Sequence, residues 1–139
     1  LDMPNRTPRH AHQRHTLEER REILRVEQQV ASTLAALPEP LRTAAEELIV
    51  VVEGRASAEQ YRDLLAEGEG LYGLFDGAPR GAHDGYGEPP PRITLFALPL
   101  VEDFPDDATL ASEIRKTIVH ELGHYLGFDD RDLHQRGLE

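Results

Sequence analysis

The pattern of apolar and polar residues predicts four helices along the chain. The first covers about residues 17–37, where apolar side chains recur every three or four positions. A shorter helix is expected in EPLRTAAEEL, because a proline near the start of a helix needs no N–H. The third is SAEQYRDLLAEG, which opens at Ser57 with the Ser-x-x-Gln spacing of a capping box. The last is expected over about residues 108–126.

Three segments predict strands. LIVVVEG is a short β-branched run, typical of a strand buried on both faces. GLYGLFDG is a weaker strand, because Gly73 interrupts it. RITLFALPLV is a clear strand that Pro99 ends and places at an edge of the sheet. Between the second and third strands, residues 76–91 form a long loop rich in glycine and proline, which indicates a functional or disordered segment.

These elements predict an α+β fold, with helices packed on a small mixed or antiparallel sheet of about three strands. The chain has 139 residues, so we expect one domain over residues 17–139, preceded by a disordered basic tail over residues 1–16. No internal repeat is visible.

Charge and composition restrict the possible partners. The formal net charge is −11, and since the first 15 residues carry +2, the remainder carries −13. Such an acidic body argues against nucleic-acid binding, and favours basic or neutral peptides over acidic ones. There is no apolar run long enough to cross a membrane, and there is no cysteine, so we expect a cytoplasmic protein. The oligomeric state is open, with a monomer as the default.

The last predicted helix has one apolar stripe and one polar face. At 100° per residue, His120 and His124 fall opposite the apolar stripe, on neighbouring turns. They belong to the sequence HELGH, the H-E-x-x-H pattern in which two histidines bind zinc and the glutamate, here Glu121, acts as the base. The bland alternative is a solvated helix face without a metal.

A catalytic zinc ion usually has three protein ligands and one open position. Gly127 follows the helix at the point where glycine commonly turns the chain back, so a third ligand can come from the residues just beyond it. Asp129, Asp130 and Asp132 are the candidates.

The extended sequence HELGHYLGFDD matches H-E-x-x-H-x-x-G-x-x-D, the signature of zincin peptidases with aspartate as the third ligand. The chain resembles a family of small bacterial zincin-like proteins described as minimal metallopeptidases. The resemblance also covers GLYGLFDGAP, RITLFALPLVEDF and EIRKTIVHELGHYLGFDDRDL, roughly the C-terminal half. It implies a zincin-like single domain with one zinc ion held by His120, His124 and Asp130.

The resemblance implies a zinc-dependent metallopeptidase that hydrolyses peptide bonds through a metal-bound water, with Glu121 as general base. The substrate would be a peptide or protein added to the edge strand ITLFAL. Glu113 is a candidate partner for the imidazoles, and His83, Tyr86 and Arg92 are candidates for stabilising the oxyanion. Two alternatives stay open: a catalytically weak or inactive zincin fold that serves as a metal-binding or regulatory module, and a mononuclear iron oxygenase.

Overall fold

The computed structural model describes residues 14–66, 70–82 and 89–139. No helix in these segments is both long and apolar enough to cross a membrane. The elements in chain order are α1 (Leu17–Ala35), α2 (Leu41–Glu46), β1 (Ile49–Glu53), α3 (Ala58–Ala66), β2 (Gly73–Asp76), β3 (Arg92–Phe96), α4 (Ala97–Asp103), α5 (Asp107–Leu126) and α6 (Asp130–Gln135).

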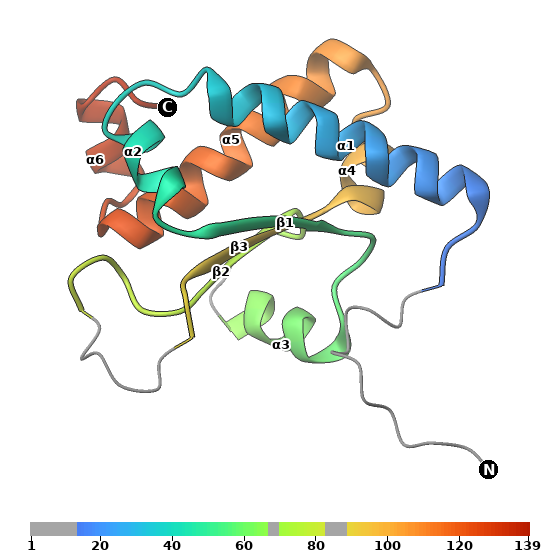
Figure 1. Ribbon diagram of the computed structural model, residues 1–139, viewed down its shortest axis with the longest axis horizontal. Coiled ribbons are helices and arrows are strands. Elements are labelled where there is room, and N and C mark those ends of the chain that lie inside the picture. The colour runs from blue at the N-terminus through green and yellow to red at the C-terminus, as the bar shows by residue number, and fades with distance from the viewer. Residues whose placement is uncertain (1–13, 67–69, 83–88) are drawn as a thin grey trace.

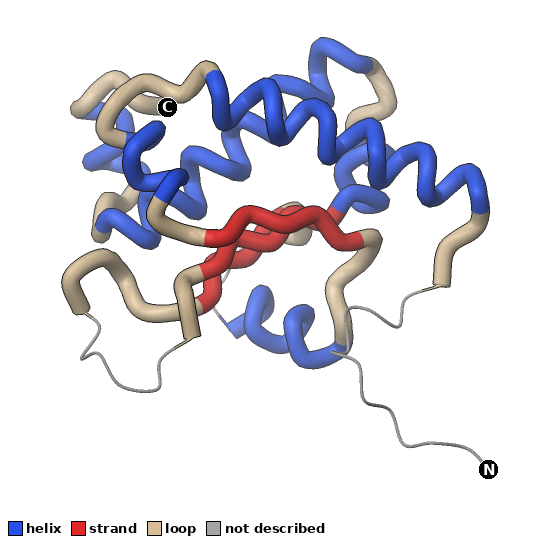
Figure 2. The backbone as a smooth tube through the Cα atoms, viewed as in Figure 1, coloured by secondary structure: helices blue, strands red, loops and turns tan. Residues whose placement is uncertain are grey.

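The strands form one mixed sheet in the order β1-β3-β2. Figure 2 shows the strands together in red. β3 pairs in parallel with β1 and antiparallel with β2. The predicted α+β class with a small mixed sheet is therefore confirmed. The predicted weak strand around Gly73 is also present, as β2.

The prediction that RITLFALPLV is an edge strand is wrong. β3 lies in the centre of the sheet and ends at Phe96, and the residues after it form α4. Pro99 lies in the first turn of α4, where backbone N–H groups have no partner within the helix. A proline after an apolar run is therefore compatible with the start of a helix as well as with the end of a strand.

The prediction that LIVVVEG is buried on both faces is also wrong. β1 is an edge strand, and its first residue, Ile49, keeps 38% of its surface exposed. Its β-branched residues still pack well, because Val50 and Val52 contact the main core.

Helices cover the two faces of the sheet unequally. α1 and α5 lie on one side of the sheet and α3 lies on the other (Figure 1). Ile93 and Leu95 of β3 join the main core with residues of α1 and α5. On the opposite face, Phe96 packs with Leu64 of α3 and Leu74 of β2 in a smaller cluster.

α1 and α3 each begin with a capping box, in which two residues three apart each accept the other's backbone N–H with a side-chain oxygen. At α1, the Glu19 N–H donates to Thr16 Oγ1 over 3.0 Å, and Thr16 N–H donates to Glu19 Oε1 over 2.9 Å. At α3, Ser57 and Gln60 form the same pair of bonds, over 2.8 and 3.1 Å. The predicted capping box at Ser57 is confirmed. Of the predicted tail, residues 1–13 lie outside the described residues.

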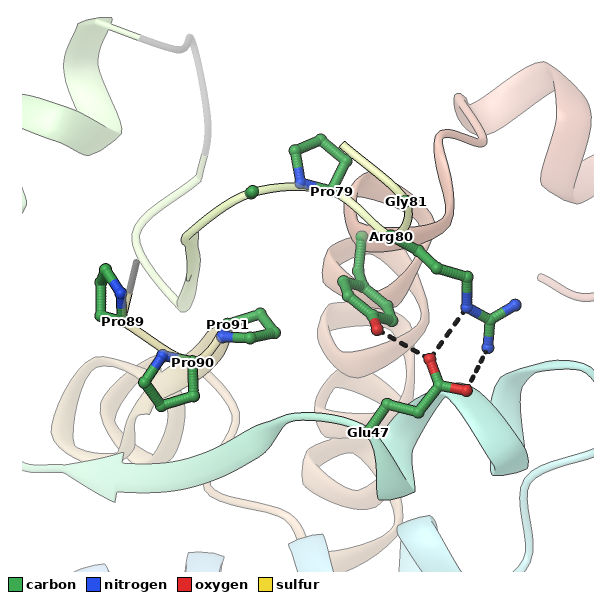
Figure 3. A pocket seen from close by; sticks show the side chains of 9 residues that line it. Glu47, Pro79, Arg80, Gly81, Pro89, Pro90 and Pro91 are labelled. Carbon is green, nitrogen blue, oxygen red and sulfur yellow. Dashed lines mark hydrogen bonds and ion pairs between the residues drawn. The ribbon is translucent and has the colours of Figure 1, made fainter. Parts of the chain in front are cut away.

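The described start of the long loop is attached to the rest of the fold by one cluster of side chains (Figure 3). The Arg80 guanidinium donates two hydrogen bonds to the Glu47 carboxylate, each 2.9 Å long. The Tyr125 hydroxyl donates to the same carboxylate over 2.7 Å, and Arg80 N–H donates to the Tyr125 carbonyl oxygen over 2.7 Å. This clamp, formed by Glu47, Arg80 and Tyr125, joins the loop to the last turn of α5. It lines a hollow together with Pro79 and Pro89–Pro91.

The clamp makes stability depend on pH. Its hydrogen bonds with Arg80 and then Tyr125 lower the pKa of Glu47 below its usual value. A carboxyl group whose pKa is lower in the folded state stabilises the fold above its unfolded pKa, and that contribution is lost as the pH falls through the folded pKa. We therefore expect Glu47→Gln to reduce the free energy of unfolding at neutral pH. In acid, below both pKa values, the difference from wild type should vanish.

Urea unfolding of both proteins at neutral and acid pH measures this difference. Glu46→Gln is the matched control, because it makes the same charge change on the neighbouring residue, which is also exposed. A deficit of Glu47→Gln that persisted unchanged in acid would contradict the prediction.

Candidate metal centre

Helix α5 presents the candidate site. The Asp106 side chain caps its start by accepting the Thr109 N–H over 3.0 Å, and the helix ends at Gly127, whose φ of 78° lies in the left-handed region. The predicted apolar stripe is buried in the core, at Leu110, Ile114, Ile118, Val119, Leu122 and Tyr125. This burial turns the opposite face of the helix, with the two histidines, outward.

His120, Glu121 and His124 form a compact group of potential ligands. One ligand atom from each of the three lies within 4.8 Å of the others. The two imidazole rings have centroids 4.6 Å apart, and their side chains are 35% and 30% exposed. His124 Nδ1 lies 3.5 Å from Glu121 Oε1. The group thus combines two accessible nitrogen donors with a carboxylate.

Glu121 differs from the histidines because it is buried, with only 2% of its surface exposed. It lies where β2 approaches α5. A Cβ atom added at Gly73 would be 2.5 Å from Thr117 Cγ2 and 3.6 Å from Glu121 Cγ, so the close approach requires glycine at this position. In the sequence analysis, Gly73 served only to weaken the prediction of a strand in GLYGLFDG. A glycine inside a strand also marks a close backbone approach, and that signal identifies it.

The turn after α5 brings Asp130 to the first histidine. Gly127 reverses the chain, and α6 then begins with Asp129 as its cap. Asp129 and Asp132 form a capping box with bonds of 2.8 and 3.0 Å, which occupies both carboxylates. The third candidate, Asp130, places Oδ1 3.0 Å from His120 Nδ1. It stands outside the three-residue group and its side chain is 76% exposed.

His120 lines three hollows. The first lies between the start of β2 and α5 and is lined by Gly70, Tyr72, Gly73, Lys116, Thr117, His120 and Glu121. The second lies towards α6 and is lined by Lys116, Val119, His120, Asp130, Leu133 and Glu139. The third lies at the turn after α5 and is lined by His120, His124, Gly127, Phe128, Asp129 and Asp130. Lys116 lines the first two of these hollows, a position that no local sequence pattern indicated.

Tyr72 at the rim of the first hollow stays protonated. Its hydroxyl donates to Asp103 Oδ2 over 2.5 Å, and this hydrogen bond with burial raises the pKa of Tyr72 to about 12. The ring packs against Phe104, with centroids 5.3 Å apart. The phenol is thereby held at the wall of the hollow, with its proton directed to Asp103.

Other residues proposed from the sequence are placed elsewhere. Arg92 alternates with Ile93 along β3, so it lies on the sheet face opposite α5. The Glu113 carboxylate lies 3.2 Å from Lys116 Nζ, and it is Asp130 that contacts His120. His83 and Tyr86 lie outside the described residues.

Comparison with curated proteins gave no match. Residues 45–138 match the sequence pattern of a family described as zincin-like metallopeptidase. The matched region covers more than half of the chain, and contains all three strands, helix α5 and the group formed by His120, Glu121 and His124. The fold and this potential metal-binding group agree with that match, and the chain therefore belongs to the zincin-like metallopeptidase family.

Proposed function

We propose that this protein is a zinc-dependent peptidase in which His120, His124 and Asp130 hold one zinc ion and Glu121 is the general base. The observation that carries the proposal is the group of two imidazoles and one buried carboxylate, whose ligand atoms lie within 4.8 Å of one another. Membership of a metallopeptidase family implies a metal and peptide or protein substrates.

The donor set suits zinc. Imidazole nitrogen and carboxylate oxygen are common zinc ligands, and without cysteine the chain has no thiolate to offer. The Asp130 carboxylate at 3.0 Å from His120 Nδ1 supports a role for Asp130 at the ion, either as third ligand or by orienting the His120 ring. When bound, zinc supplies a Lewis acid that polarises the scissile carbonyl and makes water more acidic.

Glu121 is placed to move protons. Its side chain is buried between α5 and β2, so bulk water has little access to the carboxylate. In the proposed reaction it accepts a proton from the attacking water and passes that proton to the amine that leaves. The 3.5 Å contact with His124 Nδ1 holds it beside the candidate ligands.

The substrate platform differs from the one expected from the sequence. ITLFAL belongs to the central strand, whereas β2 pairs with β3 on one side and has no second partner among the described strands. β2 runs beside α5, with Gly73 against Thr117 and Glu121. An extended peptide adding to the free edge of β2 would place its backbone next to Glu121. Bacterial origin, cytoplasmic location and a monomeric state stay predictions from the sequence.

Zinc binding is the first test of the proposal. For wild-type protein without a histidine tag, zinc at about 100 times its Kd should raise the free energy of unfolding by about 2.7 kcal/mol. Asp130→Ala should weaken zinc binding by roughly tenfold or more. At the same zinc concentration the gain should therefore fall to about 1.4 kcal/mol or less. Isothermal titration with zinc and chemical unfolding measure the two quantities.

Asp129→Ser is the matched control, because serine also caps helices well and only the carboxylate is lost. Its zinc affinity should equal that of wild type. Loss of zinc binding in Asp129→Ser, with normal binding in Asp130→Ala, would assign the carboxylate ligand to Asp129 and contradict the proposed set.

Catalysis has a separate test in Glu121→Gln. This variant should keep zinc, because the proposed ligands are intact, while cleavage of a peptide library should fall by about 10²–10⁴-fold through loss of the base. Cleavage at the wild-type rate would remove Glu121 from that role. Wild-type protein that binds zinc but cleaves no peptide would support the metal-binding module instead.

A further inference from the structure

Lys116 lies beside the candidate metal centre, a location that its local sequence does not predict. It is the only lysine in the chain. It lies four residues before His120 in α5, and side chains with this spacing share one face of a helix. It also lines two of the three hollows that flank His120. A single ammonium group thus stands beside the candidate metal centre on two sides.

The present partner of Lys116 is weakly held. Its Nζ lies 3.2 Å from Glu113 Oε2, and the two side chains are 68% and 23% exposed. Ion pairs on the surface contribute about 0–1 kcal/mol, because water competes for both charges. A carboxylate brought by a ligand can therefore replace Glu113 at Lys116 at little cost.

The direction of β2 determines which part of a bound peptide reaches Lys116. Gly73 lies against Thr117 and Glu121, while the Phe75 ring lies 6.0 Å from that of Tyr125, so β2 runs in the same direction as α5. Antiparallel pairing is slightly stronger per residue than parallel pairing. A peptide added in this way to the free edge of β2 runs opposite to α5. Its C-terminal part then arrives at the Gly73 end, where Lys116 lies.

We infer that Lys116 selects peptides with a carboxylate on the C-terminal side of the cleaved bond. The carboxylate belongs either to an acidic side chain or to the free C-terminus of the substrate. This inference rests on the proposed function and adds a substrate class to it.

The remaining charges near Lys116 sharpen the inference. Glu113 is its ion-pair partner, and the other ionised groups lining the hollow towards α6 are Asp130 and Glu139. Without the ammonium group, the hollow towards α6 keeps only acidic charges among its ionised groups. Lys116→Gln should therefore lose the preference for acids. The net charge of −11 acts in the same direction on the whole peptide.

The cleavage profile is the first measurement. Wild-type protein loaded with zinc is incubated with a mixed peptide library, and the products are sequenced by mass spectrometry. Asp, Glu or a free C-terminus should be enriched after the cut in wild type. The enrichment should be absent in Lys116→Gln and replaced by Lys and Arg in Lys116→Glu. Arg115→Glu is the matched control, since it makes the same change in net charge and does not line either hollow.

Binding is measured independently of turnover with the zinc-loaded Glu121→Gln variant. Three pools of fluorescent peptides are compared by polarisation: neutral peptides with an amidated C-terminus, the same peptides with one Glu in the C-terminal half, and neutral peptides with a free C-terminus. At least one acidic pool should bind about two- to fivefold tighter than the neutral amidated pool, as expected for one exposed ion pair. The acidic pool that binds more tightly identifies the source of the carboxylate.

Adding Lys116→Glu to this variant should reverse the order, whereas adding Arg115→Glu should preserve it. Equal affinity for all three pools, or the same order with Lys116→Glu, would overturn the inference whether or not the wild type cleaves peptides. Failure of the proposed function would give a different result, because wild-type protein would then bind no zinc or would cleave no peptide. Zinc titration of each variant ensures that peptide affinities are compared only between proteins that hold the metal.

Discussion

The close approach of β2 to α5 is the contact on which the candidate site depends. A side chain at position 73 would collide with Thr117, so the strand reaches the helix only because Gly73 has none. The approach buries Glu121 and brings β2, an edge strand of the described sheet, to the same place. Because protein interiors are densely packed, this contact between β2 and α5 cannot loosen gradually. The carboxylate and the strand edge are therefore held in one arrangement, while the imidazoles remain open to solvent on the outer side of the helix.

Features that depend on local periodicity could be predicted from the sequence. The apolar stripe of α5 and the outward direction of His120 and His124 follow from the helical repeat alone, and the capping box at Ser57 follows from two residues. The place of a strand within the sheet could not be predicted in this way. Pro99 suits the first turn of α4 as well as the end of a strand, and the apolar run of β1 does not reveal that the strand has only one neighbour.

Within the site, the helical pattern left three aspartates as candidates beyond Gly127, and the family resemblance implied Asp130. The structure separates them because Asp129 and Asp132 cap α6, which leaves Asp130 beside His120. This short helix was not predicted, since its capping box has aspartate where glutamate or glutamine is usual. Lys116 was missed for a different reason. Its neighbours come from β2 and α6, which are remote from one another in the chain, and no local pattern brings them together.

The turn at Gly127 has a consequence for how the protein assembles. The proposed ligands lie between residues 120 and 130, so one helix, one glycine turn and one cap bring them together. Closing so short a loop costs little chain entropy, whereas pairing β1 with β3 joins positions about forty residues apart. In the proposed function, metal capture would thus be a low-contact-order event that does not have to wait for the sheet. The edge of β2 that is proposed to bind peptides, by contrast, exists only after long-range strand pairing is complete.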